Sequence, residues 1–306
     1  MTTVCVFGGT GFLGRRLVRR LVSNGTAVRV AVRHRGQARS ASAAADLDGV
    51  TVFAADVRDR SSIAGAVSGA DAVVNAVSAY VETGDVTFTA VHEQGAGTLA
   101  REAASAGLAR LVLVSGIGAD PESNSAYIRS RGRGERAVQE AFPRATIVRP
   151  SAMFGHGDAL FGTLAHLARL LPVLPLIGGG HTNLQPVFVD DVAEAIARLL
   201  ADPGTAGRTY ELGGPKVYTM RELVMIALRI MGRWRFLAPV PFAVAEVQAR
   251  LFELMPNPPL TTGQVDLLKA DNVASGNLPG LRELGIEPKS VEEIVPNYLG
   301  PSHARP

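Results

Sequence analysis

The chain of 306 residues has a single cysteine, Cys5, and only three lysines among its 31 basic residues. A lone cysteine excludes an intrachain disulfide, and a chain of this length buries enough surface to fold without one. Charged residues make up only 19% of the chain, whereas hydrophobic residues make up 47%. This balance excludes an intrinsically disordered chain, which is rich in charge and poor in apolar residues.

Long uninterrupted apolar runs are missing as well. The longest stretch without Asp, Glu, Lys or Arg, residues 170–189, is interrupted by Pro172, Pro175 and a run of three glycines. Such a stretch cannot cross a bilayer as one helix, so we expect no transmembrane span. The first residues carry no basic segment ahead of their apolar run, so we expect no secretory signal. The expected location is cytoplasmic, with the inner face of a membrane left open.

The excess of basic over acidic residues is small. The net charge is +3, and residues 1–150 carry 18 basic against 13 acidic side chains. A modestly basic first half suits a small anionic ligand and is too weak to indicate nucleic acid. The six histidines show no metal-like spacing, so we expect no metal site.

Residues 1–150 alternate short apolar runs with helical patterns. We expect strands at 4–8, 27–32, 50–54, 72–76, 111–115 and 146–149, and helices at 11–23, 61–67, 88–106 and 127–142. Continuous apolar strands between helices predict an α/β fold with a doubly wound parallel sheet, the Rossmann type. We expect residues 1–150 to form the nucleotide-binding domain, and residues 151–306 a smaller C-terminal lobe packed on it rather than an independent module.

A glycine-rich loop follows the first expected strand and opens the first helix. It comprises Gly8, Gly9, Thr10, Gly11, Phe12, Leu13 and Gly14. Glycines permit the tight turn and let the backbone approach a pyrophosphate, whose charge the helix N-terminus favours. The loop therefore predicts a dinucleotide site, and the alternative is an ordinary glycine-rich turn.

The second expected strand ends in Arg33-His34-Arg35, where NAD-binding proteins carry an acidic residue for the ribose hydroxyls. A guanidinium can grip a 2′-phosphate, which a carboxylate would repel. Arg33 therefore favours NADP(H) over NAD(H). The alternative is a solvated arginine in an arginine-rich chain.

These features resemble the short-chain dehydrogenase/reductase superfamily. The further matching residues are Asp56 and Val57 after the third strand, Asn75, Ala76 and Val77 at the end of the fourth, Ser115 as the last residue of the fifth, and Pro150 in the segment 149–155. The resemblance implies that Asp56 and Val57 contact adenine, that the fourth strand abuts the cofactor, and that Pro150 lies beside the nicotinamide.

Several later segments narrow the resemblance to the atypical group around the Rossmann-fold accessory subunit of respiratory complex I and its bacterial relatives. They are residues 125–135, 185–192, 210–215, 258–265, 271–273 and 284–286. This resemblance implies an accessory or quinone-linked role near complex I, with the nucleotide largely structural. Two alternatives stay open: an active NADPH-dependent reductase of an apolar carbonyl or quinone, and a redox-sensing regulatory module.

The catalytic residues implied by the resemblance are Ser115, Tyr127 and Arg131. In a working member, a serine orients the substrate, and a tyrosine and a lysine lie at i and i+4 on one helix face. Here Arg131 stands where the lysine is expected. A guanidinium is also a cation that can bind ribose hydroxyls, but its planar fork of donors differs from an ammonium. Retained function and relaxed catalysis with retained nucleotide binding are both open.

The segment 242–255 is broadly apolar, with Glu246, Arg250 and Glu253 on one helical stripe. It could pack within the protein, cover a substrate, meet a partner or lie on a membrane. Its acidic balance argues against simple attraction to anionic lipid. Because the segment is apolar, peripheral membrane contact nevertheless stays open.

Overall fold

The computed structural model describes residues 2–33, 48–253, 255 and 260–300. The chain divides into two compact units. The first unit comprises Met1–Pro150, Val189–Leu212 and Gly276–Ile286, and the second comprises Ser151–Phe188, Gly213–Ser275 and Glu287–Pro306. The first segment of the first unit ends at Pro150. Two segments of the expected lobe 151–306, Val189–Leu212 and Gly276–Ile286, belong to the first unit.

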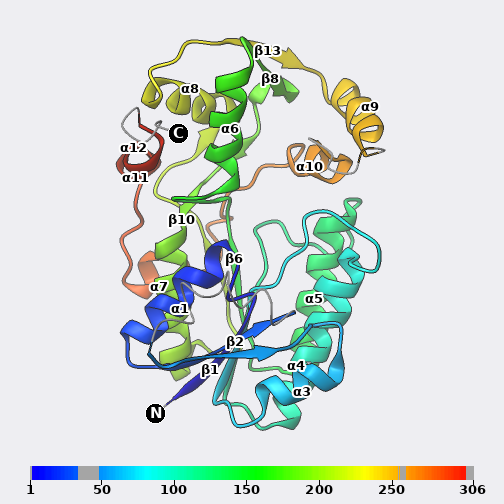
Figure 1. Ribbon diagram of the computed structural model, residues 1–306, viewed down its shortest axis with the longest axis vertical. Helices are drawn as coiled ribbons and strands as arrows, with labels where there is room; N and C mark the ends of the chain where they lie inside the picture. Colours follow the sequence, from blue (N-terminus) through cyan, green and yellow to red (C-terminus); the bar gives the residue numbers. More distant parts are fainter. Residues whose placement is uncertain (1, 34–47, 254, 256–259, 301–306) are drawn as a thin grey trace. The chain divides into compact units, whose positions relative to one another are not determined.

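The first unit is built on one sheet of seven parallel strands in the order β11-β6-β5-β4-β1-β2-β3 (Figure 1). The strands are β1 (Thr3–Phe7), β2 (Ala27–Val32), β3 (Val50–Ala54), β4 (Ala72–Asn75), β5 (Arg110–Val114), β6 (Thr146–Pro150) and β11 (Thr209–Leu212). The returning strand β11 pairs with β6 and so completes the sheet. The order of the first six strands is that of the doubly wound fold, as the sequence predicts.

Helices cover both faces of this sheet. Helix α1 (Phe12–Ser23) packs against α7 (Val189–Ala201) on one face, and α3 (Arg60–Val67), α4 (Ala96–Ser105) and α5 (Ala126–Ala141) cover the other (Figure 1). Short helical turns at η4 (Pro203–Thr205) and η5 (Arg282–Leu284) complete the unit. With both faces covered, the central strands are buried along their length. Cys5 on β1 is fully buried, and this burial raises the pKa of its thiol to about 12.

The expected helix 88–106 is divided in the structure. Its first part, η2 (Thr89–Gly95), is a π-helix, which continues into α4. The backbones of α5 and η2 lie so close together that a Cβ atom on Gly134 would be only 2.0 Å from the carbonyl oxygen of His92. Segments of π-helix are rare and frequently occur at functional sites. Here the π-helix carries His92, whose side chain is buried inside the first unit.

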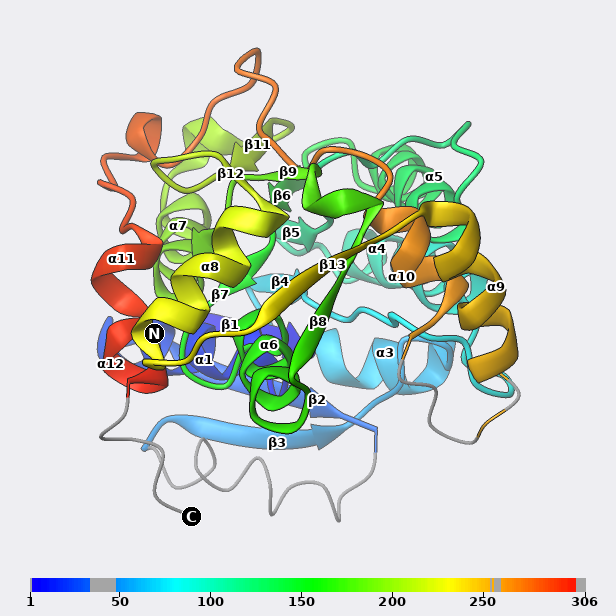
Figure 2. The ribbon, with the colours of Figure 1, turned by 90° about the horizontal axis from the view of Figure 1, so that it is seen from above.

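Within the described residues, the second unit contains three two-stranded sheets and several helices (Figure 2). Its strands are β7 (Met153–Phe154), β8 (Val173–Ile177), β9 (Asn183–Leu184), β10 (Val187–Phe188), β12 (Tyr218–Thr219) and β13 (Phe236–Val240). Its helices are α6 (Ala159–Leu170), η3 (Gly178–Gly180), α8 (Met220–Ile230), α9 (Phe242–Phe252), α10 (Thr262–Leu267), α11 (Val291–Ile294) and α12 (Pro296–Leu299). A capping box of Thr219 and Glu222 starts α8.

Two small hydrophobic clusters lie within the described residues of the second unit. One joins α6, β8 and α8 through Ala168, Leu174 and Leu228, and the other joins α9 to α10 through Ala249 and Val265. None of the helices formed by the described residues is long and apolar enough to span a bilayer.

Candidate functional site

The glycine loop between β1 and α1 is too compact for larger residues at two of its positions. Gly8 has a φ of +82°, and a Cβ atom there would lie 2.6 Å from the carbonyl oxygen of Ala76. A Cβ atom on Gly14 would lie 2.1 Å from the carbonyl oxygen of Gly8. Glycine is therefore required where the loop meets the end of β4 and where α1 leaves the loop.

The N-terminus of α1 is open to an anion. The N–H of Gly11 donates to the carbonyl of Gly8 at 2.9 Å, and Gly11 then caps the helix without a side-chain hydrogen bond. The first turn, which contains Phe12 and Leu13, carries no acidic residue. Its N–H groups and the helix dipole suit a pyrophosphate, so this loop fits a dinucleotide. Thr10 lies at the loop tip, where its carbonyl accepts from the Arg15 guanidinium at 3.1 Å.

Arg33 lies directly after β2 and is exposed, and His34 and Arg35 lie outside the described residues. No described residue forms an ion pair with Arg33. Asp56 follows β3, and its pKa is lowered, first by the hydrogen bond from Arg58 and in smaller part by the charge of Arg33. Arg58 also pairs with Asp85 at 2.8 Å, so its guanidinium is already held by two carboxylates. Arg33 is therefore the cation left free among the described residues at this edge.

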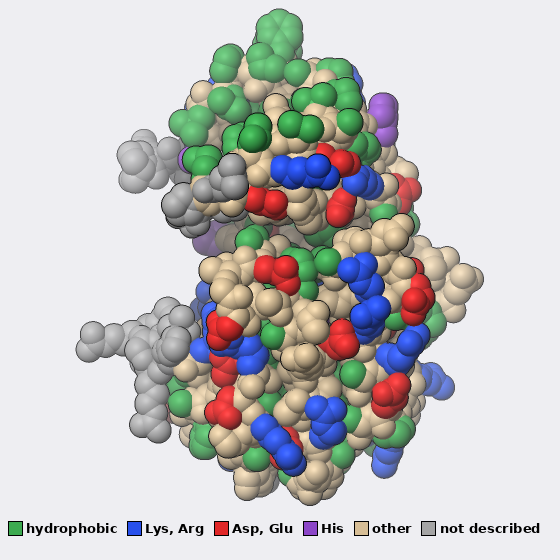
Figure 3. Space-filling model, turned by 90° about the vertical axis from the view of Figure 1, so that its right-hand side faces the viewer, with side chains coloured by type: hydrophobic (Ala, Val, Ile, Leu, Met, Phe, Trp, Pro, Cys, Tyr) green, Lys and Arg blue, Asp and Glu red, His purple; other side chains and the backbone are tan. Residues whose placement is uncertain are grey.

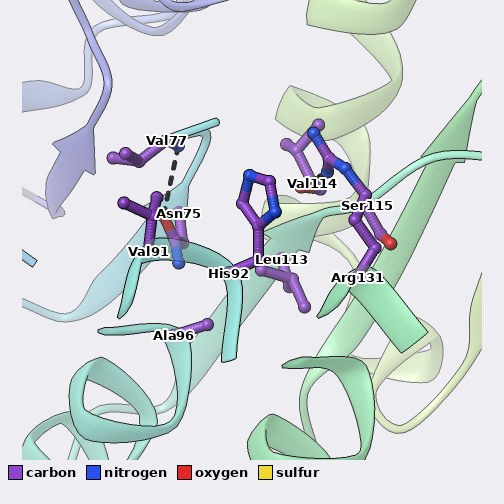
Figure 4. A pocket seen from close by; sticks show the side chains of 9 residues that line it. All are labelled: Asn75, Val77, Val91, His92, Ala96, Leu113, Val114, Ser115 and Arg131. Carbon is purple, nitrogen blue, oxygen red and sulfur yellow. Dashed lines mark hydrogen bonds between the residues drawn. The ribbon is translucent and has the colours of Figure 1, made fainter. Parts of the chain in front are cut away.

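The ends of β4 and β5 line a small pocket with η2 and α5 (Figure 4). Its lining residues are Asn75, Val77, Val91, His92, Ala96, Leu113, Val114, Ser115 and Arg131. Figure 4 shows His92 between the side chains from the end of β4 and those of Ser115 and Arg131. Ligands of doubly wound sheets bind at the carboxyl ends of the strands, and the pocket lies there.

Ser115 is 6% exposed, and its Oγ has no hydrogen-bond partner among the described residues. Buried hydroxyls in folded proteins almost always have partners. An unpaired hydroxyl in the lining of a pocket is therefore available to a ligand oxygen.

Tyr127 and Arg131 lie one turn apart on α5, and the structure joins them directly. The Nε of Arg131 donates to the Tyr127 hydroxyl at 2.9 Å. The two other guanidinium nitrogens donate to the Val114 carbonyl at 3.2 Å and to the Ser78 hydroxyl at 2.5 Å. Because Arg131 supplies the proton of its own hydrogen bond, the Tyr127 hydroxyl keeps its proton for another acceptor.

Arg131 is a buried cation whose hydrogen-bond partners are all neutral. It is 8% exposed, and the nearby carboxylate of Glu135 is held by Arg149 at 2.6 Å. Burial lowers the pKa of Arg131, but Tyr127, Tyr80 and Glu135 together raise it above its ordinary value, so the group stays charged. A buried charge is costly without a counterpart, so this position favours an electron-rich ligand.

His92 is a site residue that the sequence interpretation missed. Its Nε2 accepts from the Ala79 N–H at 3.0 Å, and its Nδ1 lies 2.9 Å from the Ser130 hydroxyl. Burial, and then the charge of Arg131, lower the pKa of His92 to about 3, so the ring is neutral. Since an amide N–H can only donate, the ring proton is on Nδ1 and points to Ser130, which in turn donates to the Tyr127 carbonyl at 2.8 Å.

Aromatic rings enclose Tyr127 on several sides. Tyr80 stacks on it with ring centroids 5.7 Å apart, and Phe88 and His92 meet it edge to face, each at 5.5 Å. These contacts restrict the rotation of the tyrosine ring. A histidine on the apolar face of the expected helix 88–106 was the available sequence signal, because a buried imidazole needs partners.

The sequence-predicted residues thus fall into two groups. Asn75, Val77, Ser115 and Arg131 share the pocket lining, and Tyr127 contacts Arg131. The others lie along the carboxyl ends of the neighbouring strands: the glycine loop after β1, Arg33 after β2, Asp56 and Val57 after β3, Ala76 after β4, and Pro150 at the end of β6. No group of three or more potential metal ligands occurs among the described residues.

Comparisons with known proteins identify the family and the fold of the chain. The model of a family described as NAD(P)H-binding matches residues 8–203. The mitochondrial NADH dehydrogenase (ubiquinone) 1 alpha subcomplex subunit 9 of Arabidopsis thaliana is 35% identical over 306 residues, which covers 96% of this chain and 76% of that protein. A ceramide reductase of Caulobacter vibrioides is 34% identical, covering 75% of this chain and 70% of that protein.

Among solved structures, the dTDP-glucose 4,6-dehydratase DesIV from Streptomyces venezuelae, with NAD bound, superposes with a TM-score of 0.77. It is 25% identical and covers 97% of this chain and 96% of that chain. The chain is therefore similar over most of its length to proteins that share a nicotinamide-binding Rossmann fold.

Proposed function

The chain belongs to the NAD(P)H-binding family of atypical short-chain dehydrogenase/reductases that includes the accessory subunits of respiratory complex I, and from this premise we propose that it binds NADP(H) and acts as an accessory, quinone-linked factor of complex I. The 2′-phosphate would meet Arg33, the pyrophosphate the glycine loop, and the nicotinamide end the pocket between Asn75 and Ser115. This role would place the protein at the inner face of the membrane that holds complex I.

The observation that carries this proposal is the position of the Arg131 guanidinium. Three of its N–H groups are engaged by Tyr127, Val114 and Ser78, all groups of the protein itself. Two N–H groups remain for the hydroxyls of a bound ribose. A guanidinium also keeps its proton, because its pKa lies above about 12, and so it cannot relay one. The arrangement supports a firm nucleotide grip more than rapid proton transfer.

Two measurements test the accessory role. The purified protein should bind NADPH in titration calorimetry yet oxidise it negligibly with quinones and apolar carbonyls. The tagged protein, isolated from membranes in a mild detergent, should carry NADH:quinone oxidoreductase activity with it. A Gly11→Val variant serves as the control for a dependence on bound nucleotide. Rapid NADPH turnover by the isolated protein without any associated complex would contradict the proposal.

An active reductase is the second candidate, and the unpaired Ser115 hydroxyl favours it. Ser115 Oγ would donate to the carbonyl oxygen of a substrate, and the Tyr127 hydroxyl would give that oxygen its proton. The bound nicotinamide supplies the hydride in such a reaction. The similarity to a ceramide reductase supports an apolar carbonyl as the substrate class. Turnover that disappears in a Tyr127→Phe variant would favour this candidate over the accessory role.

A further inference from the structure

The second unit exposes a compact group of large apolar side chains at one end. It consists of Leu170, Leu171, Val173, Trp234 and Phe236, which we call the Trp234 patch. Trp234 is 70% exposed, Leu170 65% and Phe236 62%. Figure 3, which faces the side of this unit on which α9 and α10 lie, shows further exposed apolar side chains there. Single exposed apolar residues are ordinary, but a contiguous group marks an interaction site.

The patch is held in place by the surrounding backbone. Phe236 pairs with Val173 in the parallel β8–β13 ladder, and its N–H donates to the Pro172 carbonyl at 3.3 Å. The Arg235 guanidinium donates to the Ala168 carbonyl at 2.9 Å and to the Trp234 carbonyl at 2.7 Å. The rings of Trp234 and Phe236 meet edge to face at 4.4 Å. The two aromatic rings are therefore presented to solvent on a fixed base.

Along the chain, the charged residues beside the patch have one sign. The exposed Arg169, Arg229 and Arg233 lie next to it in the chain or in the last turn of α8, and residues 159–189 and 223–245 contain no Asp or Glu. The apolar segment 242–255 differs from the Trp234 patch because it contains acidic residues. Its helix α9 exposes Val244, Val247 and Leu251 but also carries Glu246, which pairs with Lys269 at 2.8 Å.

We propose that the Trp234 patch docks on an anionic lipid surface, with Trp234 and Phe236 in the interfacial layer and Arg169, Arg229 and Arg233 on the headgroups. Tryptophan is enriched at membrane interfaces, because its ring is apolar and its N–H polar. Arginines beside an anionic leaflet add attraction, and an acid-free border adds no repulsion. This surface shares no residue with the nucleotide site, so the inference goes beyond the proposed function.

Trp234 is the only tryptophan in the chain and reports on its own docking. The full chain is mixed with phosphatidylcholine vesicles with and without phosphatidylglycerol, and cosedimentation and tryptophan emission are measured. We expect binding and a blue shift with the anionic vesicles, quenching by brominated acyl chains, and weaker binding at high salt. Absence of binding to the anionic vesicles would overturn the proposal.

Three variants complete the test. Phe236→Asp should weaken vesicle binding about tenfold or more, because an apolar ring is replaced by a charge. Arg233→Glu should weaken it at least about fivefold. Val217→Asp changes a valine that is 41% exposed near the N-terminal end of α8, and it should bind like the parent. NADPH affinity, measured alongside, should not change in any variant, which separates this surface from the nucleotide site.

Two further outcomes would overturn the proposal. One is a Phe236→Asp variant that binds vesicles as tightly as the parent. The other is a protein that dimerises without lipid and becomes monomeric in Phe236→Asp with unchanged vesicle binding, because the patch would then join two copies of the chain.

Discussion

The Nε of Arg131 donates a hydrogen bond of 2.9 Å to the hydroxyl of Tyr127, one helical turn earlier on α5. The bond orients the tyrosine oxygen and leaves its proton free for another acceptor. The same guanidinium reaches Val114 at the end of β5 and Ser78 beyond β4. Arg131 therefore ties the helix to the carboxyl ends of two neighbouring strands.

Replacing Arg131 with lysine tests what this arrangement does to chemistry. An ammonium has three donors on one nitrogen and would be freer to move than the guanidinium fork. If catalysis is relaxed in the parent, Arg131→Lys should raise single-turnover NADPH oxidation with carbonyls or quinones by roughly 10²-fold. NADPH affinity is measured separately, so that a binding loss is not mistaken for a loss of chemistry.

The matched control for this gain is the double variant Arg131→Lys with Tyr127→Phe. It should lose the gain, because the phenylalanine cannot donate the proton. Rates that respond to neither substitution would show that Ser115, Tyr127 and Arg131 do not form a catalytic group.

Arg33 is expected to set the cofactor preference. NADPH should bind more tightly than NADH, and Arg33→Asp should weaken NADPH binding by roughly ten- to a hundredfold, because a charge-assisted hydrogen bond contributes about 1.5–3 kcal/mol. Titration calorimetry with both cofactors measures this. Arg208→Asp makes the same charge change at the opposite end of the sheet and should leave both affinities unchanged. Equal affinities of the parent for the two cofactors would refute the assignment.

Two glycines of the loop should respond differently to valine. A Cβ atom on Gly11 would lie 3.1 Å from the Gly8 carbonyl oxygen, whereas one on Gly14 would lie 2.1 Å from it. Gly11→Val should therefore fold and lose nucleotide binding, since its side chain fills the space of the pyrophosphate. Gly14→Val should also lower the thermal midpoint, because the backbone has to move. Circular dichroism and the amount of co-purified nucleotide distinguish the two, and nucleotide retained by Gly11→Val would count against the loop assignment.

Burial of neutral His92 should make stability depend on pH. Its pKa is about 3 in the folded protein, against about 6.5 when unfolded, so the unfolded chain binds the extra proton between these values. The free energy of unfolding therefore carries no penalty from His92 well above pH 6.5. It falls as the pH drops from 6.5 toward 3, by about 1.4 kcal/mol per pH unit. Urea unfolding at pH 7 and pH 5 measures the loss.

A His92→Gln variant should be less stable at pH 7 and show a smaller loss between pH 7 and pH 5. The exposed His166 provides the control, and His166→Gln should keep the pH dependence of the parent. An unchanged pH dependence in His92→Gln would assign the effect to other groups.

Local patterns were enough to predict the first six strands of the first unit. The strands expected at 27–32 and 50–54 have those bounds in the structure, because short runs rich in valine favour an extended chain at the centre of a sheet and at its edge alike. The glycine loop was predictable for a similar reason. Its glycines are spaced within a few residues of chain, between the end of one strand and the first turn of a helix.

The sequence by itself therefore determined the strands, the glycine loop and the spacing of Tyr127 and Arg131. Only the tertiary structure decided that β11 returns to the sheet, that His92 is buried neutral, and that Ser78 receives the Arg131 guanidinium. Ser78 and Arg131 are 53 residues apart in the chain. Partners at such separations are chosen by the packing of whole elements, and no local pattern of apolar and polar residues records that choice.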